Sequence, residues 1–267
     1  MNRLDGKIAF VSGAARGIGA ATARLMVEAG AKVAIGDLLD ERGHETARSL
    51  KEAGGQSVYV HLDVTRADDW GAAIAATVAH FGGLDILVNN AGIFLAKDLE
   101  ESTKADWERL CGVNLTGVIL GTRTALPALR ERGAASPQGS AIINLSSMVG
   151  LVGSAMAPLY SLTKGGITAF TKSMALEFAR KQYRIRVNSI HPGIIDDEMG
   201  GQAIAARARM KGEANMELAH AQASAAHPIG RLGTVTDIAH GIVFLASDDA
   251  GFMTGSALVV DGGWTAQ

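Results

Sequence analysis

A tyrosine and a lysine four residues apart carry the strongest chemical signal in this sequence. Tyr160 and Lys164 fall in Tyr-Ser-Leu-Thr-Lys, within a strongly helical stretch. This interval places both side chains on one helix face, so the ammonium can approach the phenol oxygen. A free tyrosine has a pKa of about 10, too high for a base at neutral pH, and a nearby cation lowers it. The pair predicts proton transfer by Tyr160, although alone it equally fits an interfacial tyrosine and a solvated lysine.

Ser147 precedes this pair by 13 residues and follows an apolar run, residues 142–145, that is typical of a strand. Active-site groups of open α/β sheets gather at the carboxyl ends of strands. We therefore expect the Ser147 hydroxyl to hydrogen-bond the reacting oxygen, with a plain turn serine as the alternative.

A glycine-rich turn follows the first apolar run of the chain. Gly13, Gly17 and Gly19 allow a tight turn that sets a helix N-terminus, with its free amides, against a pyrophosphate. The spacing is G-x-x-x-G-x-G and differs from the general G-x-G-x-x-G dinucleotide pattern. Glycines can also serve a strand-to-helix turn for purely steric reasons.

Asp37 follows the second predicted strand, 18 residues after Gly19. A carboxylate there can accept hydrogen bonds from a ribose 2′-hydroxyl and would repel a 2′-phosphate, which favours NAD over NADP. Arg16 is the opposing signal, because a guanidinium near the adenosine ribose can pair with a 2′-phosphate.

Short β-rich runs alternate with helix-length segments, which predicts βαβ units and a parallel sheet. Consecutive apolar residues in several runs indicate strands covered on both faces. The predicted fold is a seven-stranded, doubly wound α/β sheet with helices on both faces and helix starts at Asp40, Thr65 and Thr236. The strands are expected at 8–11, 33–35, 57–61, 86–88, 141–145, 186–190 and 257–260.

Residues 1–267 are expected to form a single domain, because no polar low-complexity stretch suggests a linker. Residues 196–227 break the rhythm: they contain no predicted strand and are rich in alanine, with methionines at 199, 210 and 216. We expect a mobile, apolar substrate lid there, with an ordinary amphipathic helix pair as the alternative.

Composition narrows the function classes. The chain has 25 basic and 27 acidic residues without a basic stripe, so nucleic acid is not expected as a partner. The first apolar run is too short for a signal peptide or a membrane span, which predicts a cytoplasmic protein without a membrane partner. Cys111 is the only cysteine and is expected to be inert packing. The seven histidines show no metal-binding pattern, so no metal is predicted.

The full set of motifs resembles the single-domain short-chain dehydrogenase/reductase family nearly from end to end, with a texture closest to members that act on cyclic alcohols and hydroxysteroids. The motifs that follow the family's order and spacing are Gly13-(x3)-Gly17-Ile18-Gly19, Asp63-Val64, Asn89-Asn90-Ala91-Gly92, Asn114, Ser147, Tyr160, Lys164 and His191-Pro192-Gly193.

The resemblance implies a Rossmann-like fold, a homotetramer and a role for each matching position. Tyr160 would be the general acid/base, Ser147 would orient the substrate oxygen, Lys164 would bind the nicotinamide ribose and tune Tyr160, and Asn114 would hold a relay water. Ser147 and Tyr160 would also bind substrate. The positions expected to bind the cofactor are Gly13, Arg16, Gly17, Ile18, Gly19, Asp37, Leu38, Asp63, Val64, Asn90, Ala91, Gly92, Tyr160, Lys164, Pro192, Gly193, Ile195 and Asp197.

Asp197 departs from the family pattern, which commonly has threonine there. A carboxylate can accept from the carboxamide of the nicotinamide but would repel phosphate oxygens, so a weakened cofactor affinity or a rearranged loop is expected.

The sequence thus predicts an NAD-dependent oxidoreductase that interconverts a hydrophobic, cyclic secondary alcohol and its ketone. One alternative is a 3-oxoacyl thioester reductase, which would be expected to use NADPH. The enoyl reductases of the wider family have a longer tyrosine-to-lysine interval and are disfavoured. A non-catalytic NAD-binding or scaffold protein is the alternative from another class.

Overall fold

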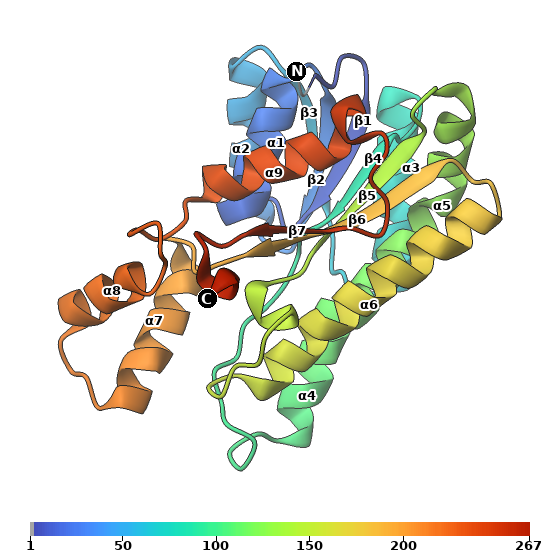
Figure 1. The fold of residues 1–267 in the computed structure, drawn as a ribbon. Helices are drawn as coiled ribbons and strands as arrows, with labels where there is room; N and C mark the ends of the chain where they lie inside the picture. The colour runs from blue at the N-terminus through green and yellow to red at the C-terminus, as the bar shows by residue number, and fades with distance from the viewer. Residues whose placement is uncertain (1–2) are drawn as a thin grey trace.

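The computed structural model describes residues 3–267, so the first two residues of the predicted domain lie outside the described part. One parallel seven-stranded sheet has the order β3-β2-β1-β4-β5-β6-β7 (Figure 1). The strands are β1 (Ile8–Ser12), β2 (Lys32–Asp37), β3 (Gln56–His61), β4 (Ile86–Asn89), β5 (Ser140–Leu145), β6 (Ile185–Pro192) and β7 (Ala257–Val260). The order reverses direction beside β1, so the predicted doubly wound sheet is confirmed.

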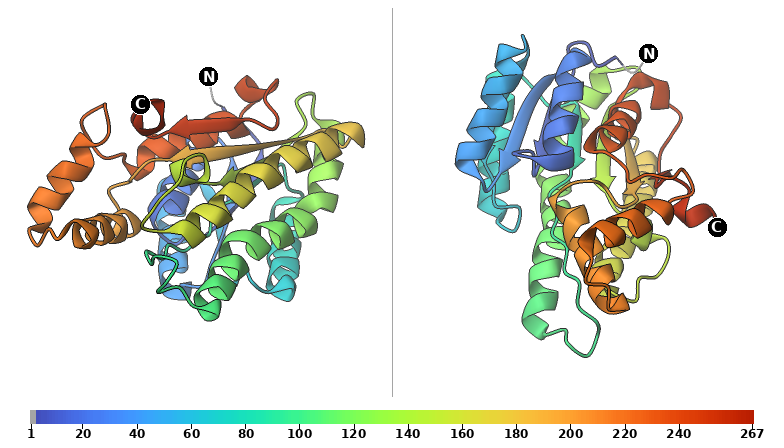
Figure 2. Two further views of the ribbon diagram at one scale, coloured as in Figure 1. Left: turned by 60° about the horizontal axis from the view of Figure 1, so that its bottom comes forward. Right: turned by 90° about the vertical axis from the view of Figure 1, so that its left-hand side faces the viewer.

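Helices cover both faces of the sheet, as the two further views in Figure 2 show. They are α1 (Gly17–Glu28), α2 (Asp40–Glu52), α3 (Ala67–Phe81), α4 (Lys104–Cys111), α5 (Gly117–Ala135), α6 (Pro158–Arg180), α7 (Glu198–Lys211), α8 (Met216–Ala225) and α9 (Val235–Ala246). A π-helical turn (Gly112–Thr116) joins α4 to α5, and single 3₁₀ turns lie at Met148–Gly150, Asp248–Ala250 and Trp264–Ala266.

The strand β1 shows why its apolar residues run without a break. Ala9 and Val11 belong to the core on the side of α1, α2 and α9, whereas Ile8 and Phe10 belong to the core on the side of α3, α5 and α6. Successive side chains of a strand point to opposite faces, and both faces are covered here, so every position is apolar.

Two of the predicted helix starts are wrong by a residue or two. The helix predicted to be capped by Thr236 is capped by Thr234, whose side chain accepts from the Asp237 N–H while the Asp237 carboxylate accepts from the Thr234 N–H. Thr236 lies inside α9. Likewise the N-cap of α3 is Arg66 rather than Thr65, because the Thr65 N–H and hydroxyl are held by Asp63. Asp40 is the first residue of α2, after the N-cap Leu39.

The pair α7–α8 projects from the body beyond the carboxyl edge of the sheet (Figure 1). It is held by a small apolar cluster in which Ile204, Ala208 and Ala223 contact Met148 and Leu232 of the body. The 196–227 segment contains no strand, as expected, and forms the helix pair that was the alternative prediction, while its role as a mobile lid stays a prediction. No helix within residues 3–267 combines the length and apolar composition that a membrane crossing requires.

Candidate active site

The carboxyl edge of the sheet gathers most of the predicted site residues. Parallel pairing aligns Ser12 with Gly36 and Asn89 with Asn144, so the segments that leave these strands start side by side. The glycine turn follows β1, Asp37 ends β2, Asn90 follows β4 and Ser147 follows β5. The crevice outside this edge is where open α/β sheets bind their ligands.

Tyr160 lies in the first turn of α6 and is buried. Burial raises the pKa of its phenol to about 12, the Ser147 hydroxyl lowers it through a hydrogen bond, and the negative charge of Asp197 raises it further. The ring of Phe94 meets the Tyr160 ring edge-on, with 5.0 Å between the ring centres. The structure therefore brings Ser147 and Tyr160 together in an apolar setting.

Lys164 is one helical turn further along α6 and is also buried. Its Nζ donates to the Leu145 carbonyl at 2.8 Å and lies 5.7 Å from the centre of the Tyr160 ring. Burial lowers the pKa of the ammonium to about 8. In this structure burial dominates the pKa of the Tyr160 phenol, and the ammonium donates to a backbone carbonyl, so the expected lowering of that pKa by Lys164 stays a prediction.

Asn114 lies in the π-helical turn and is buried. Its Oδ1 accepts from the Ile93 N–H at 2.9 Å, and its Nδ2 donates to the Ile93 carbonyl at 3.0 Å and to Thr163 Oγ1 at 3.2 Å. Both amide protons are thus used, and Oδ1 keeps room for one further donor such as a water.

His191 holds the backbone carbonyl of Ser147 in place. Its Nδ1 is 2.9 Å from the Ser147 carbonyl and its Nε2 is 2.8 Å from Ser189 Oγ, which together require a proton on Nδ1. Burial lowers the pKa of this imidazole, so the ring is neutral. These contacts give His191 a structural role beside Ser147.

The glycine turn fits a dinucleotide. The N-cap residue of α1, Arg16, makes no side-chain cap, so the first N–H groups of the helix remain available to an anion. A Cβ on Gly13 would lie 2.7 Å from the Ala91 backbone. The Asn90 amide donates to the carbonyls of Ser12 and Gly13, both at 2.9 Å, and fixes the turn against the segment after β4.

Asp37 is oriented by the backbone around it. One carboxylate oxygen accepts from the Ala15 N–H at 2.9 Å and the other from the Leu39 N–H at 3.1 Å. Leu38 beside it is largely exposed, whereas Asp63 is bonded to Thr65 and Val64 is buried next to Trp70. Asp37 therefore presents a fixed acceptor at the edge of the crevice.

The start of α7 reaches the glycine turn. Asp197 is the N-cap of α7 and accepts from the Gly200 N–H at 2.8 Å, while its other oxygen would lie 3.7 Å from a Cβ on Gly17. Arg16 forms an ion pair with Glu198, so its guanidinium is already engaged by α7 in this arrangement. The predicted contact of Asp197 with a cofactor stays a prediction.

The segment between β6 and α7 contains Gly193 and Ile195 and begins after Pro192, the last residue of β6. A buried histidine, His227, holds this segment in place, and the sequence analysis did not predict that role. His227 Nδ1 lies 2.9 Å from the Ala223 carbonyl, and its Nε2 accepts from the Ile194 N–H at 3.2 Å. It thereby joins the end of α8 to the exit of β6. No motif marks this role. Among residues 3–267 no three His, Cys, Asp or Glu side chains converge as a metal site.

Comparisons with known proteins agree with this geometry. The family model described as enoyl-(acyl carrier protein) reductase, of the short-chain dehydrogenase type, matches residues 13–265. A 3-alpha-(or 20-beta)-hydroxysteroid dehydrogenase of Mycobacterium tuberculosis is 42% identical over 99% of this chain and 91% of its own. A trans-4-hydroxycyclohexanecarboxylate dehydrogenase of Sinomonas cyclohexanicum is 38% identical over 99% and 95%, and a cyclopentanol dehydrogenase of Comamonas testosteroni is 35% identical over both entire chains.

The sheet, the glycine turn and the Ser147–Tyr160–Lys164 group define an oxidoreductase of the kind that uses a nicotinamide dinucleotide. The chain belongs to the short-chain dehydrogenase/reductase family. Since the relatives are named as dehydrogenases, the non-catalytic scaffold alternative is set aside.

Proposed function

We propose that this enzyme interconverts a hydrophobic, cyclic secondary alcohol and its ketone, with NAD as its preferred cofactor. The observation that carries the proposal is the buried Tyr160 with Ser147 bonded to its phenol and apolar side chains around it, namely Ile93, Phe94, Leu95, Val149, Met156 and Leu159. The relatives named above act on cyclic alcohols and hydroxysteroids by their names, and none of those three is named as a thioester reductase.

A bound nicotinamide dinucleotide supplies the acceptor for the hydride that leaves the alcohol carbon. Tyr160 takes the proton of the alcohol on its phenolate oxygen, and the Ser147 hydroxyl donates a hydrogen bond to the substrate oxygen. Because burial raises the phenol pKa, Tyr160 needs nearby positive charge to act as a base, and we expect the Lys164 ammonium, 5.7 Å from the centre of its ring, to supply it. In the reverse direction Tyr160 returns the proton to the ketone oxygen.

The preference for NAD rests on Asp37 and Arg16 together. Asp37 is held by two backbone N–H groups and offers a fixed acceptor to the ribose hydroxyls. Arg16, the residue that could bind a 2′-phosphate, forms an ion pair with Glu198. The wild-type preference is the kcat/KM with NAD divided by the kcat/KM with NADP. We expect Asp37→Asn to lower this preference by about tenfold or more, because the repulsion of the 2′-phosphate is removed. A wild-type preference for NADP would overturn the assignment.

An absorbance screen at equal cofactor concentrations tests the function. Cyclic alcohols, hydroxysteroids, sugars and acyl thioesters are offered with NAD and with NADP, and the corresponding ketones with the reduced cofactors. The expected result is turnover of cyclic alcohols or hydroxysteroids with NAD. Turnover confined to 3-oxoacyl thioesters with NADPH would replace the proposal by the thioester reductase.

Three further features belong to the proposal. Residues 196–227 act as a substrate lid on a single domain, because α7–α8 contacts the body through a small cluster and starts beside the cofactor crevice.

The second feature is a homotetramer. Its interfaces would bury three apolar side chains that are exposed in the single chain, namely Ile119 of α5 and Leu162 and Leu176 of α6. A monomeric mass by light scattering would refute the tetramer. The protein is expected to work in the cytoplasm.

A further inference from the structure

A cationic side chain outside the catalytic group lacks a counter-charge. Arg207 lies on α7, and within the described part of the chain its guanidinium has no ion pair and no hydrogen bond. Its Nε is shielded from solvent without a partner, and its guanidinium stacks 5.1 Å from the centre of the Trp264 ring. The Nε–H is therefore a buried donor without an acceptor, which a ligand oxygen could satisfy.

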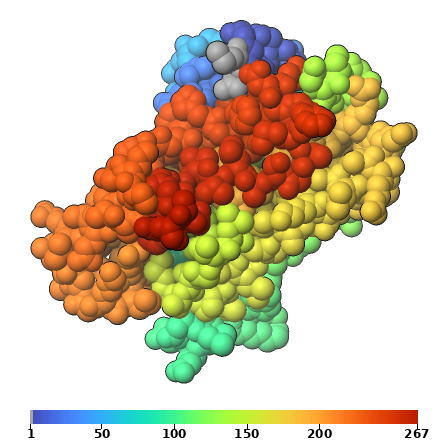
Figure 3. All heavy atoms as spheres, viewed as in Figure 1, coloured from blue at the N-terminus to red at the C-terminus, as the bar shows by residue number. Residues whose placement is uncertain are grey.

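Arg207 lines a cavity of about 410 Å³ between the α7–α8 pair and the body. The other lining residues are Val152, Ala225, Ala226, Trp264, Thr265 and Gln267. In Figure 3 the C-terminal residues, coloured dark red, lie between the orange α7–α8 pair and the yellow-green segment that follows Ser147. The cavity has an apolar wall and one cation, and no acidic side chain lines it.

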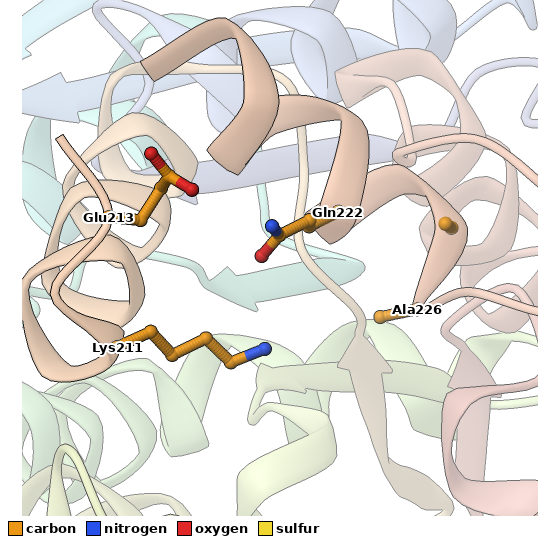
Figure 4. Close-up of a pocket in the computed structure, with 5 residues that line it drawn as sticks. Lys211, Glu213, Gln222 and Ala226 are labelled. Atoms are coloured by element: carbon orange, nitrogen blue, oxygen red, sulfur yellow. The ribbon is translucent and has the colours of Figure 1, made fainter. Parts of the chain in front are cut away.

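A second cavity of about 550 Å³ adjoins the first and shares Ala225 and Ala226 with it. Lys211, one helical turn beyond Arg207, and Gln222 both extend into this space in Figure 4. Glu213 also lines it, with Oε1 accepting from the Asn215 N–H. The outer space therefore has side chains of both charges, whereas Arg207 is the one charged side chain among the described residues that line the inner cavity.

An apolar contact of Val149 links the surroundings of the Arg207 cavity with those of Tyr160. Val149 packs both with the cluster that contains Tyr160 and with the cluster that contains Trp264. At the other side, Asp197 is near enough to Tyr160 to raise its pKa, and Arg207 follows ten residues later on the same helix. Ten residues span about 15 Å of helix, which suits an extended fused-ring molecule.

From these contacts we propose that Arg207 binds a carboxylate at the end of the substrate remote from the reacting hydroxyl. The substrate is then an extended, apolar cyclic alcohol that carries an acidic group. A guanidinium donates two parallel hydrogen bonds to a carboxylate, and the Trp264 ring holds its plane in place. This inference rests on the proposed function, since it assigns the substrate of the same site.

Matched acids and esters test the inference. The probes are a 3-hydroxysteroid with a side-chain carboxylate and its methyl ester, and 4-hydroxycyclohexanecarboxylate and its methyl ester. For the wild type we expect kcat/KM to favour the steroid acid over its ester by about tenfold or more, with a smaller preference in the short pair. Arg207→Met, which keeps length and apolar contact, should remove the preference by lowering kcat/KM for the steroid acid about tenfold more than kcat/KM for its ester.

Arg209→Met is the matched control, because Arg209 is on the same helix and exposed; it should keep the preference. If Arg207→Met unfolds at a lower temperature than the wild type, Arg207→Lys replaces it as the test variant. Arg207→Lys should keep part of the preference for the acid, because it keeps the positive charge. Equal kcat/KM for acid and ester in the wild type overturns the inference, as does a preference that survives in Arg207→Met. Turnover of the esters without preference for the acids leaves the proposed function intact, whereas turnover of no alcohol at all refutes the proposed function itself.

Discussion

The proposed catalytic group and the α7–α8 pair are built differently. Ser147 follows β5, and Tyr160 and Lys164 lie buried in the first turns of α6; hydrogen bonds hold the Ser147 carbonyl and the Lys164 ammonium. The α7–α8 pair is held by a separate, smaller apolar cluster and by His227. The first arrangement suits a reaction that tolerates little displacement, and the second suits recognition that can change between relatives.

The sharpest test on the rigid side is Tyr160→Phe. Removal of the hydroxyl takes away the only side chain proposed to move the proton, so kcat should fall by about a thousandfold or more. Binding of NADH, measured by fluorescence, should change little. The control is Tyr183→Phe. Tyr183 follows the C-terminal end of α6, whereas Tyr160 lies at its start, and its ring contacts Phe178 and Arg130. Wild-type turnover in Tyr160→Phe would eliminate the mechanism.

Lys164 gives the rigid side a measurable pH dependence. Its pKa is lowered to about 8 by burial, from 10.5, so between these values the unfolded chain binds a proton that the native protein does not. Stability should therefore rise with pH across this window, by about 1.4 kcal/mol per pH unit at most. Tyr160, with a raised pKa, acts in the opposite sense only above pH 10.

Thermal unfolding at pH 7.5, 8.5 and 9.5 checks this sign. The midpoint of the wild type should rise relative to that of Lys164→Met, which has no titrating group at this position. Lys172→Met, in the same helix, is the control and should track the wild type. If the unfolding midpoints of the wild type and Lys164→Met change with pH by the same amount, the buried ammonium does not lose its proton in this range.

The fold was predictable because its signals are local and redundant. Residues 86–88 are apolar at every position since β4 is covered on both faces, and Gly13 marks a turn that only a residue without Cβ can make so close to Ala91. Helix starts were less certain. The sequence prediction places the start of α9 at Thr236, and only the reciprocal bonds with Asp237 identify Thr234 as the cap.

In the site, sequence spacing located the residues but not their electrostatics. The interval between Tyr160 and Lys164 predicts a shared helix face correctly, yet it cannot show that the ammonium donates to Leu145. Nor could it find Arg207, whose chemical interest comes from Trp264 lying 57 residues later in the chain and from the absence of a partner within residues 3–267. Such contacts depend on tertiary packing.

On the variable side, His227→Phe tests how the α7–α8 pair is held. Phenylalanine can keep the ring contact with Trp264, 5.0 Å between centres, but loses the bonds to Ile194 and Ala223. Two lost hydrogen bonds should raise KM for the alcohol by about tenfold, with kcat within about twofold. His220→Phe, at an exposed position on α8, should leave KM unchanged. A loss confined to kcat would place His227 with the catalytic group instead.

The smallest effect is expected where the two sides meet, at Asp197. Threonine can replace aspartate as the N-cap of α7, so Asp197→Thr removes a charge near Gly17 without removing the cap. KM for NAD should fall by about two- to fivefold, because the repulsion of the pyrophosphate disappears. The charge of Asp197 also raises the pKa of Tyr160, so the rise of kcat/KM with pH should shift to lower pH. Asp196→Thr, which keeps Asp197, is the control, and an unchanged KM in Asp197→Thr would mean that this carboxylate does not face the cofactor.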